Sequence, residues 1–341
     1  MPSSRVLFLL AATAAFAAPA VARAQEKELT LYSARHYQTD ERLYAHFTEK
    51  TGIKVKRVEG SEDELLERIK KEGANGPADV FITVDAARLG QADALGLFAP
   101  VRSKLLEGRI PANLRTGTWF AFSTRARVIV YDRTRVKAAD VRTYLDLADP
   151  KLKGKVCVRS GSHPYNVSLG SALIAHLGEA RTQQWANGLV ENLARAPKGG
   201  DTDQIRAVAT GECQVALANS YYVVRLLRSA KAEDQEIMKR VGVAWPDQHG
   251  NGTHINVSGG GLLKTAPHRD AAVRFLEYLA SDQAQSYFAA GNNEWPVVKT
   301  VRVDNPALAT LGSFKSDALN VATLVGNAAL AQKIFDRAGW R

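Results

Sequence analysis

The chain has 341 residues, of which 45% are hydrophobic and 23% charged, and its formal net charge is +10. This length predicts one or two domains with a large buried core. The Lys and Arg residues are spread along the chain among Asp and Glu, without a basic run interleaved with aromatics. The basic charge therefore does not indicate a nucleic-acid partner, and we expect none.

The first 24 residues predict a cleaved secretory signal peptide. Arg5 precedes an apolar run at 6–18, and Ala22-Arg23-Ala24 supplies a small-x-small cleavage site. The run is too short for a spanning helix, which disfavours the alternative of a membrane anchor. Removing Arg5 and Arg23 lowers the net charge from +10 to +8. No later segment is long and apolar enough to span a bilayer, so we expect a soluble protein in the periplasm.

The next part of the chain alternates strand-like and helix-like patterns. Ser61 to Glu64 form a capping-box sequence, and Gly52 and Gly73 lie where helices should end. The predicted elements are a strand at 28–34, a helix at 39–50, a strand at 53–60, a helix at 61–72 and a strand at 78–84. This order indicates a mostly parallel sheet with helices on both sides.

A second α/β unit follows the first. Its predicted elements are a strand at 154–160, a helix at 165–177, a strand at 214–220 and a helix at 221–228. The segments 118–132 and 253–266 are long enough to cross from one unit to the other, which predicts two lobes with a cleft between them. The run Gly259–Lys264 lacks the spacing of a phosphate loop and is interpreted as a flexible part of the second crossing.

Cys157 and Cys213 are the only cysteines, and neither belongs to a Cys-x-x-Cys pair. A zinc or thiol-redox motif is therefore not indicated. An oxidising compartment would permit a disulfide between them. The spacing leaves this disulfide and two unpaired buried thiols both open.

Tyrosines occupy three predicted strand-to-helix junctions. The sequences are YSARHYQTD, VRSGSHPYNVS and VALANSYYVVRLL. Pro164 suits the first position of one helix, and Ser220 is the predicted N-cap of another. Ligands of open parallel sheets bind beyond the carboxyl ends of the strands. We therefore expect one cleft to collect four phenols, those of Tyr37, Tyr165, Tyr221 and Tyr222.

Four phenols in one cleft indicate a hard, highly charged metal. A free phenol has a pKa near 10 and ionises at neutral pH only with help, which a ferric ion and a helix N-terminus both provide. Phenolate oxygen is a hard donor that suits ferric iron better than zinc or copper(I). Four phenolates leave the centre at −1. Arg225 shares the helix face of Tyr221 and Tyr222 and is the first candidate for the counter-charge, with Arg35 and Arg125 as further candidates.

With these motifs, the chain resembles the periplasmic ferric-ion-binding proteins of bacterial iron ABC importers over nearly its whole mature length. The resemblance rests on residues 31–55, GPADVFITVDAARL, RARVIVYD, NSYYVVRLL and NVSGGGLLKTAP. It implies a two-lobed type II periplasmic binding protein with two crossing hinge strands and a central cleft. The implied lobes are 25–124 plus 255–302 and 125–254 plus 303–341. It also implies a monomer that serves an inner-membrane permease and ATPase.

The resemblance implies one Fe(III) per chain. One branch of the family uses a histidine, a glutamate, two adjacent tyrosines and an anion such as phosphate or carbonate. Here Val84 stands where the acid is expected, with Asp85 beside it, so the tyrosine-rich, cyanobacterial-type branch is favoured. His36 is then either a fifth ligand of the metal or a hydrogen-bond donor to one of the other ligands. Ser160 and Gly161 are the candidate anion-binding residues if a synergistic anion such as carbonate takes part.

Two other classes compete with this interpretation. An enzyme is disfavoured because the chain lacks a Gly-x-Ser-x-Gly elbow and a His-Glu-x-x-His helix. A non-haem iron oxygenase would want two histidines and a carboxylate. A binding protein of the same fold for an organic cation or an oxyanion would keep its tyrosines protonated, and it would stay colourless with iron.

Overall fold

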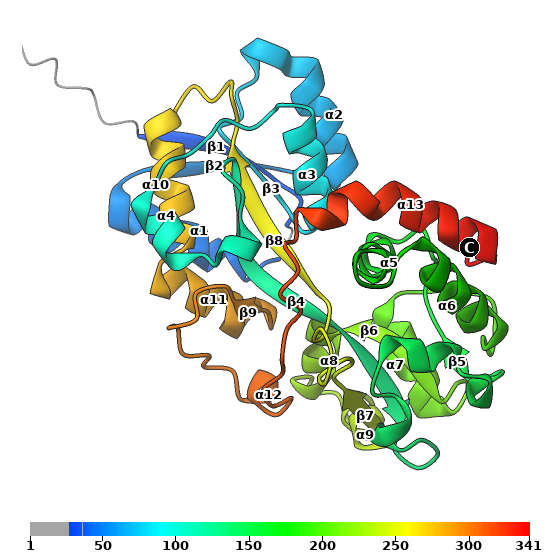
Figure 1. Ribbon diagram of the computed structural model, residues 1–341. Helices are drawn as coiled ribbons and strands as arrows, with labels where there is room; N and C mark the ends of the chain where they lie inside the picture. The colour runs from blue at the N-terminus through cyan, green and yellow to red at the C-terminus, as the bar shows by residue number, and fades with distance from the viewer. Residues whose placement is uncertain (1–26, 36) are drawn as a thin grey trace, which may run out of the picture.

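The computed structural model describes residues 27–35 and 37–341, so the predicted signal peptide and His36 lie outside the described residues. One nine-stranded sheet runs through both halves of the molecule in the order β2-β1-β3-β8-β4-β6-β5, and β7 and β9 also pair with β4. Helices gather around each end of this sheet and form two lobes (Figure 1). Among the described residues, no helix has the length and apolarity needed to cross a membrane.

The N-terminal lobe contains the first α/β unit and the chain that returns to it. Its strands are β1 (Glu28–Ser33), β2 (Lys54–Glu59), β3 (Val80–Thr83) and β9 (Trp295–Pro296). Its helices are α1 (Asp40–Thr51), α2 (Glu62–Glu72), α3 (Ala86–Ala94), α4 (Lys104–Arg109), α10 (Arg269–Leu279) and α11 (Asp282–Asn292). The capping box of Ser61 and Glu64 opens α2, and Gly52 ends α1 with φ 73°. Both signals act locally, as the sequence predicted.

The C-terminal lobe contains the second α/β unit. Its strands are β5 (Val156–Cys157), β6 (Val215–Asn219) and β7 (Val241–Ala244). Its helices are α5 (Pro164–Leu177), α6 (Glu179–Glu191), α7 (Asp201–Thr210), α8 (Ser220–Leu227) and α9 (Ala232–Arg240). The chain ends with α12 (Pro306–Ala309) and α13 (Thr323–Ala338). Helix α13 packs on α5 and α6 and also reaches α3 (Figure 1).

Two long strands connect the lobes. β4 (Trp119–Asp132) pairs with β8 and β9 at its start and with β6 and β7 at its end. β8 (Ile255–Leu262) returns antiparallel to it, and Figure 1 shows the two strands crossing the molecule diagonally. The predicted two-lobed class with two crossing strands is confirmed. The residue boundaries of the lobes stay a proposal.

The sheet is less parallel than the sequence suggested. β1 pairs parallel with β2 and β3, and β5 pairs parallel with β6. Every pairing of β4 and β8 is antiparallel. Local periodicity identifies strands but does not state their direction, and the crossing strands run against the strands beside them.

The triple glycine of β8 is buried within the sheet. Gly259, Gly260 and Gly261 are buried and pair with β3 and β4. A Cβ on Gly259 would lie 2.6 Å from the carbonyl oxygen of Phe120, and one on Gly260 would lie 2.7 Å from that of Phe81. The interpretation of this run as a flexible part of the second crossing is therefore wrong. These glycines instead permit the close approach of neighbouring backbones.

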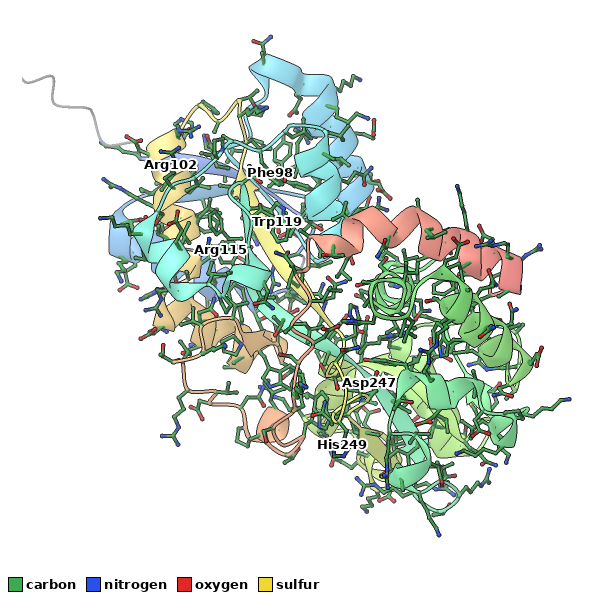
Figure 2. The ribbon with its side chains drawn as sticks, viewed as in Figure 1. Phe98, Arg102, Arg115, Trp119, Asp247 and His249 are labelled. Carbon is green, nitrogen blue, oxygen red and sulfur yellow. A yellow bond between two sulfur atoms is a disulfide. The ribbon has the colours of Figure 1, made fainter. Side chains whose placement is uncertain are left out.

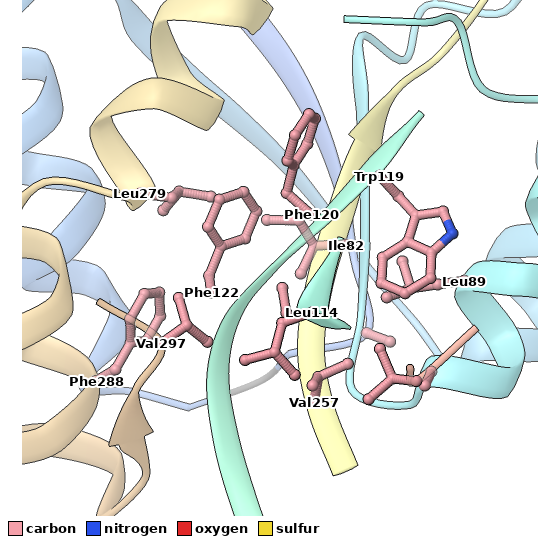
Figure 3. Packing of buried hydrophobic residues seen from close by; sticks show 14 of the residues in the cluster. Ile82, Leu89, Leu114, Trp119, Phe120, Phe122, Val257, Leu279, Phe288 and Val297 are labelled. Carbon is pink, nitrogen blue, oxygen red and sulfur yellow. The ribbon is translucent and has the colours of Figure 1, made fainter. Parts of the chain in front are cut away.

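The main core surrounds the start of β4. Figure 3 shows Phe122, Leu279, Phe288 and Val297 on one side of this strand, with Trp119 and Leu89 on the other. All six side chains are at most 3% exposed. In Figure 2, Phe98 and Trp119 mark the N-terminal lobe, whereas Asp247 and His249 lie in the C-terminal lobe. This packing anchors the start of the first crossing strand in the N-terminal lobe.

Cys157 and Cys213 form a disulfide, with their Cα atoms 5.8 Å apart. Cys157 belongs to β5, and Cys213 lies just before β6. The parallel pairing of these strands brings the two sulfur atoms together. Of the two alternatives that the sequence left open, the structure contains the disulfide.

Candidate metal centre

The four tyrosines lie at three junctions between a strand and a helix. Tyr37 lies between β1 and α1, Tyr165 is the second residue of α5, and Tyr221 and Tyr222 are the second and third residues of α8. Pro164 opens α5 as predicted. The N-cap of α8 is Asn219 rather than Ser220. The Ser220 hydroxyl instead accepts a hydrogen bond from the backbone N–H of Ala126 in β4, at 3.2 Å.

The structure brings the tyrosines of α5 and α8 together. The phenol oxygens of Tyr165 and Tyr221 lie 2.9 Å apart, at hydrogen-bond distance. The ring centroids of Tyr221 and Tyr222 are 4.2 Å apart. A charge on Tyr222 raises the pKa of Tyr37, and a charge on Tyr37 raises the pKa values of Tyr165 and Tyr221. One site therefore collects phenols from the three junctions.

Burial disfavours the anionic form of three of these phenols. Burial raises the pKa of Tyr37 to about 12. The negative charge of Glu294 adds to this shift, whereas the positive charges of Arg35 and Arg125 oppose it. Burial also raises the pKa values of Tyr165 and Tyr221, and Arg125 opposes both shifts. A ligand that takes these oxygens as anions must displace their protons.

Four buried charged side chains form a cluster next to Tyr37. Arg35 donates to both carboxylate oxygens of Asp40, at 2.9 and 3.3 Å, and to Glu294 at 3.1 Å. Arg125 donates to the other oxygen of Glu294 at 3.4 Å. All four side chains are at most 3% exposed. We call Arg35, Asp40, Arg125 and Glu294 the buried charge cluster, and its formal charges cancel.

Glu294 was not predicted from the sequence. It lies between α11 and β9, 259 residues from Arg35 in the chain. The neighbouring sequence GNNEWPVV contains no local sign of an ion pair. Only the return of the chain to the N-terminal lobe brings this carboxylate to the tyrosines.

The three predicted arginines have different surroundings. Arg35 and Arg125 belong to the buried charge cluster, and the guanidinium carbon of Arg35 is 4.9 Å from the ring centroid of Tyr37. Arg225 is exposed, and its guanidinium carbon lies 5.3 Å from the ring centroid of Tyr222 and 5.9 Å from that of Tyr221. Within the described ranges, no carboxylate forms an ion pair with Arg225.

A second set of charges lies beside Tyr165. Arg127 and Arg159 both pair with Asp201, at 2.6 and 3.2 Å. Their guanidinium carbons are 6.0 and 5.2 Å from the Tyr165 ring centroid. Two arginines against one carboxylate leave a formal +1 next to this phenol, which favours its anionic form. The sequence contains these residues but nothing that places them there.

The wall of the cleft facing Tyr165 is acidic. A cavity of about 570 Å³ is lined by Glu59, Glu62, Asp85, His163 and Tyr165, among others. The carboxylate of Glu62 accepts a hydrogen bond from the backbone N–H of Val84 at 2.9 Å. An acid from α2 therefore reaches the strand end where the sequence has Val84. Among the residues that the structure describes, no three His, Cys, Asp or Glu side chains form a metal-binding group.

His163 and the turn before α5 have structural roles. The imidazole of His163 accepts from the backbone N–H of Tyr165 at 3.2 Å. Its pKa is lowered to about 3 by burial and by Arg159 and Arg127, so it is neutral. A Cβ on Gly161 would lie 2.3 Å from the carbonyl oxygen of Trp340, so packing accounts for this glycine. The Ser160 hydroxyl hydrogen-bonds to that of Ser162 at 2.8 Å.

The two lobes, the crossing strands and the cleft are the architecture of a solute-binding protein. The family model described as bacterial extracellular solute-binding protein matches residues 42–315, and the chain belongs to this family.

Particular relatives match nearly the whole chain. It is 51% identical over 319 residues to iron uptake protein A1 of Synechocystis, covering 93% of this chain and 88% of that protein. Among solved structures, FutA (IdiA) from Trichodesmium in complex with iron and citrate is 51% identical, with a TM-score of 0.89, 92% of this chain covered and 100% of that one. The apo FutA2 of Synechocystis is 50% identical, with a TM-score of 0.88 and coverage of 93% and 100%.

Proposed function

We propose that the protein captures a ferric ion in the cleft through the phenolates of Tyr37, Tyr165, Tyr221 and Tyr222. It then delivers the ion to the permease and ATPase of an inner-membrane ABC importer. The single observation that carries the proposal is the 2.9 Å separation between the phenol oxygens of the half-buried Tyr165 and the buried Tyr221. The iron named in the Trichodesmium structure and the name of the Synechocystis relative support it.

The chemistry of the donors favours a ferric ion. Oxygen donors suit hard cations, and a trivalent ion displaces phenol protons more strongly than a divalent one. The partial positive charge at the N-termini of α5 and α8 stabilises the phenolates of their first turns. His36 adjoins Tyr37, and we include it as a fifth donor in this proposal.

The charge balance of the filled site assigns a role to Arg225. Four phenolates and one ferric ion leave a charge of −1, which is costly without a counter-charge. The buried charge cluster is already balanced internally. Arg225 over Tyr221 and Tyr222, and the surplus positive charge beside Tyr165, supply the compensation.

The test is a titration of the purified, metal-free protein with ferric citrate. The parent should take up about one iron per chain and gain a visible phenolate-to-iron band. Tyr221→Phe with Tyr222→Phe keeps the packing volume, removes two of the four phenolates and should strongly reduce both the affinity for iron and the band. Tyr287→Phe in α11 is the matched control and should behave like the parent. A parent that stays colourless would favour the alternative ligand, an organic cation or an oxyanion bound by protonated tyrosines.

A further inference from the structure

The C-terminal end of α11 receives hydrogen bonds from the other lobe. The last four carbonyl groups of a helix have no partner within that helix, so other groups must satisfy them. Arg228, which directly follows α8 in the C-terminal lobe, donates from Nη1 to the carbonyl oxygen of Ala290 at 2.6 Å. The same nitrogen donates to the side-chain oxygen of Asn293 at 2.7 Å. The helix dipole also favours a cation at this end of α11, so the cap joins the two lobes.

The segment that follows β9 contributes to the same junction. Asn305, the N-cap of α12, donates to the carbonyl oxygen of Ala289 at 2.8 Å and to the side-chain oxygen of Asn293 at 3.0 Å. Helix α12 in turn packs against α8. Asn293 ends α11 with φ 60°, a left-handed conformation that asparagine tolerates at a helix end. Its side chain therefore accepts from Arg228 and from Asn305 at once.

Helix α8 is short enough for this junction to affect the tyrosines. It has eight residues, and Tyr221 and Tyr222 lie in its first turn. At a rise of 1.5 Å per residue they are about 10 Å from Arg228 along the helix. The start of α8 follows β6 of the C-terminal lobe, whereas its end contacts α11 of the N-terminal lobe. A movement of α8 away from α11 would therefore also move these two tyrosines relative to Tyr37.

We propose that Arg228 is a positioning residue for iron capture, which holds α8 on α11 in the lobe arrangement that brings the tyrosines of both lobes together. This inference rests on the proposed function, since it concerns the same four phenols. Two lobes joined by crossing strands can rotate about a hinge. A contact between them changes ligand affinity only if it differs between the two lobe arrangements. Loss of the Arg228 contact should leave fewer molecules ready to bind and so weaken the apparent affinity.

Distances between spin labels on the metal-free protein test the lobe contact without iron. The labels are attached to Lys50→Cys at the end of α1 and to Lys239→Cys in α9, both at exposed positions in different lobes. Arg228→Gln removes the charge and shortens the side chain. The population with the main distance of the parent should fall about three- to tenfold relative to all others, because the exposed position reduces the strength of a charged hydrogen bond. Arg228→Lys keeps the charge and should lie between the two.

Two further variants locate the effect. Asn293→Gly removes an acceptor of Arg228 from the other lobe, keeps the left-handed backbone and should shift the distances in the same direction. Arg115→Gln is the matched control, because Arg115 donates to the carbonyl oxygens of Ile110 and Glu107 at 3.1 and 3.4 Å within the N-terminal lobe. It removes a similar cap from the end of α4 and should keep the distances of the parent.

The rate of iron release gives the second measurement. Iron-loaded Arg228→Gln should lose its iron to excess citrate about three- to tenfold faster than the parent, because the lobes separate more often. The wavelength of the visible band should not change, since all four phenols remain. Arg228→Lys should recover part of the rate, and Arg115→Gln should release iron like the parent.

Equal label distances in the parent and in Arg228→Gln would overturn the inference. So would an Arg115→Gln variant that releases iron as fast as Arg228→Gln. If Arg228→Gln loses free energy of unfolding in urea but keeps the distances and the release rate of the parent, the cap only stabilises the fold and the positioning role is wrong. A parent that gains no visible band with ferric citrate would contradict the proposed function, whereas the label distances would still decide whether Arg228 holds the lobes together.

Discussion

The phenol oxygens of Tyr165 and Tyr221 lie 2.9 Å apart, although 56 residues separate them in the chain. Each tyrosine belongs to the first turn of its helix, so two helix N-termini point toward one place. The two oxygens share a hydrogen bond. A cation that replaced the bonding proton would find two donors already at hand.

The number of protons released on ferric binding should equal the number of phenolates that bind the ion. The pKa of Tyr37 is raised to about 12 and that of Tyr221 is also raised, so both phenols are protonated at neutral pH. Capture of one ferric ion by four phenols should then release about four protons, and the affinity should fall as the pH falls. Calorimetry in buffers of different ionisation enthalpy measures this number. Tyr37→Phe should release one proton fewer, and an unchanged count would remove Tyr37 from the site.

Arg225→Leu should weaken ferric binding. The variant removes the cation above the rings of Tyr221 and Tyr222. Because Arg225 is exposed and screened by solvent, we expect a loss of only about two- to fivefold, which should shrink further at high salt. Competition with citrate at two ionic strengths measures it. Arg225→Lys keeps the charge and serves as the control. If the Leu variant binds iron like the parent, Arg127 and Arg159 alone compensate the negative charge of the filled site.

Gly90 in α3 should tolerate no larger residue while α13 stays in place. A Cβ at this position would lie 2.0 Å from a Val325 methyl group at the start of α13. Gly90→Ala should therefore reduce the free energy of unfolding by about 1–3 kcal/mol, despite the better helix propensity of Ala. Adding Val325→Ala removes the nearest atom and should recover part of the loss. Urea denaturation of the single and double variants gives the coupling, and additive losses would contradict this contact.

Removing the disulfide should cost stability while leaving the iron site in place. Both cysteines are buried, at β5 and just before β6. Cys157→Ala with Cys213→Ala should lower the free energy of unfolding by about 2–4 kcal/mol. Urea denaturation measures this loss. The visible band of the iron-loaded variant should match that of the parent, because Cys213 lies before the start of β6, whereas Tyr221 and Tyr222 follow its end. A stability equal to that of the parent would show that the link adds nothing in solution.

The sequence by itself determined the elements and the residues that carry the proposed chemistry. Apolar periodicity and caps such as Ser61, Gly52 and Pro164 act over one or two helical turns, so their effect can be predicted locally. The tyrosines could be found in the same way, because a strand-to-helix junction is a local feature. The rule that ligands bind beyond the carboxyl ends of strands then predicted one shared cleft.

Only the tertiary structure decided which groups surround those tyrosines. Strand direction, the close packing around Gly259 and the role of the Ser220 hydroxyl depend on neighbours far away in the chain. Glu294 is the clearest case, since it reaches Arg35 across 259 residues of sequence. Buried charges find their partners wherever the fold leaves no water, and local periodicity does not report such pairings. The proposed phenolate donors could therefore be found from the sequence, whereas the charges around them were set by the fold.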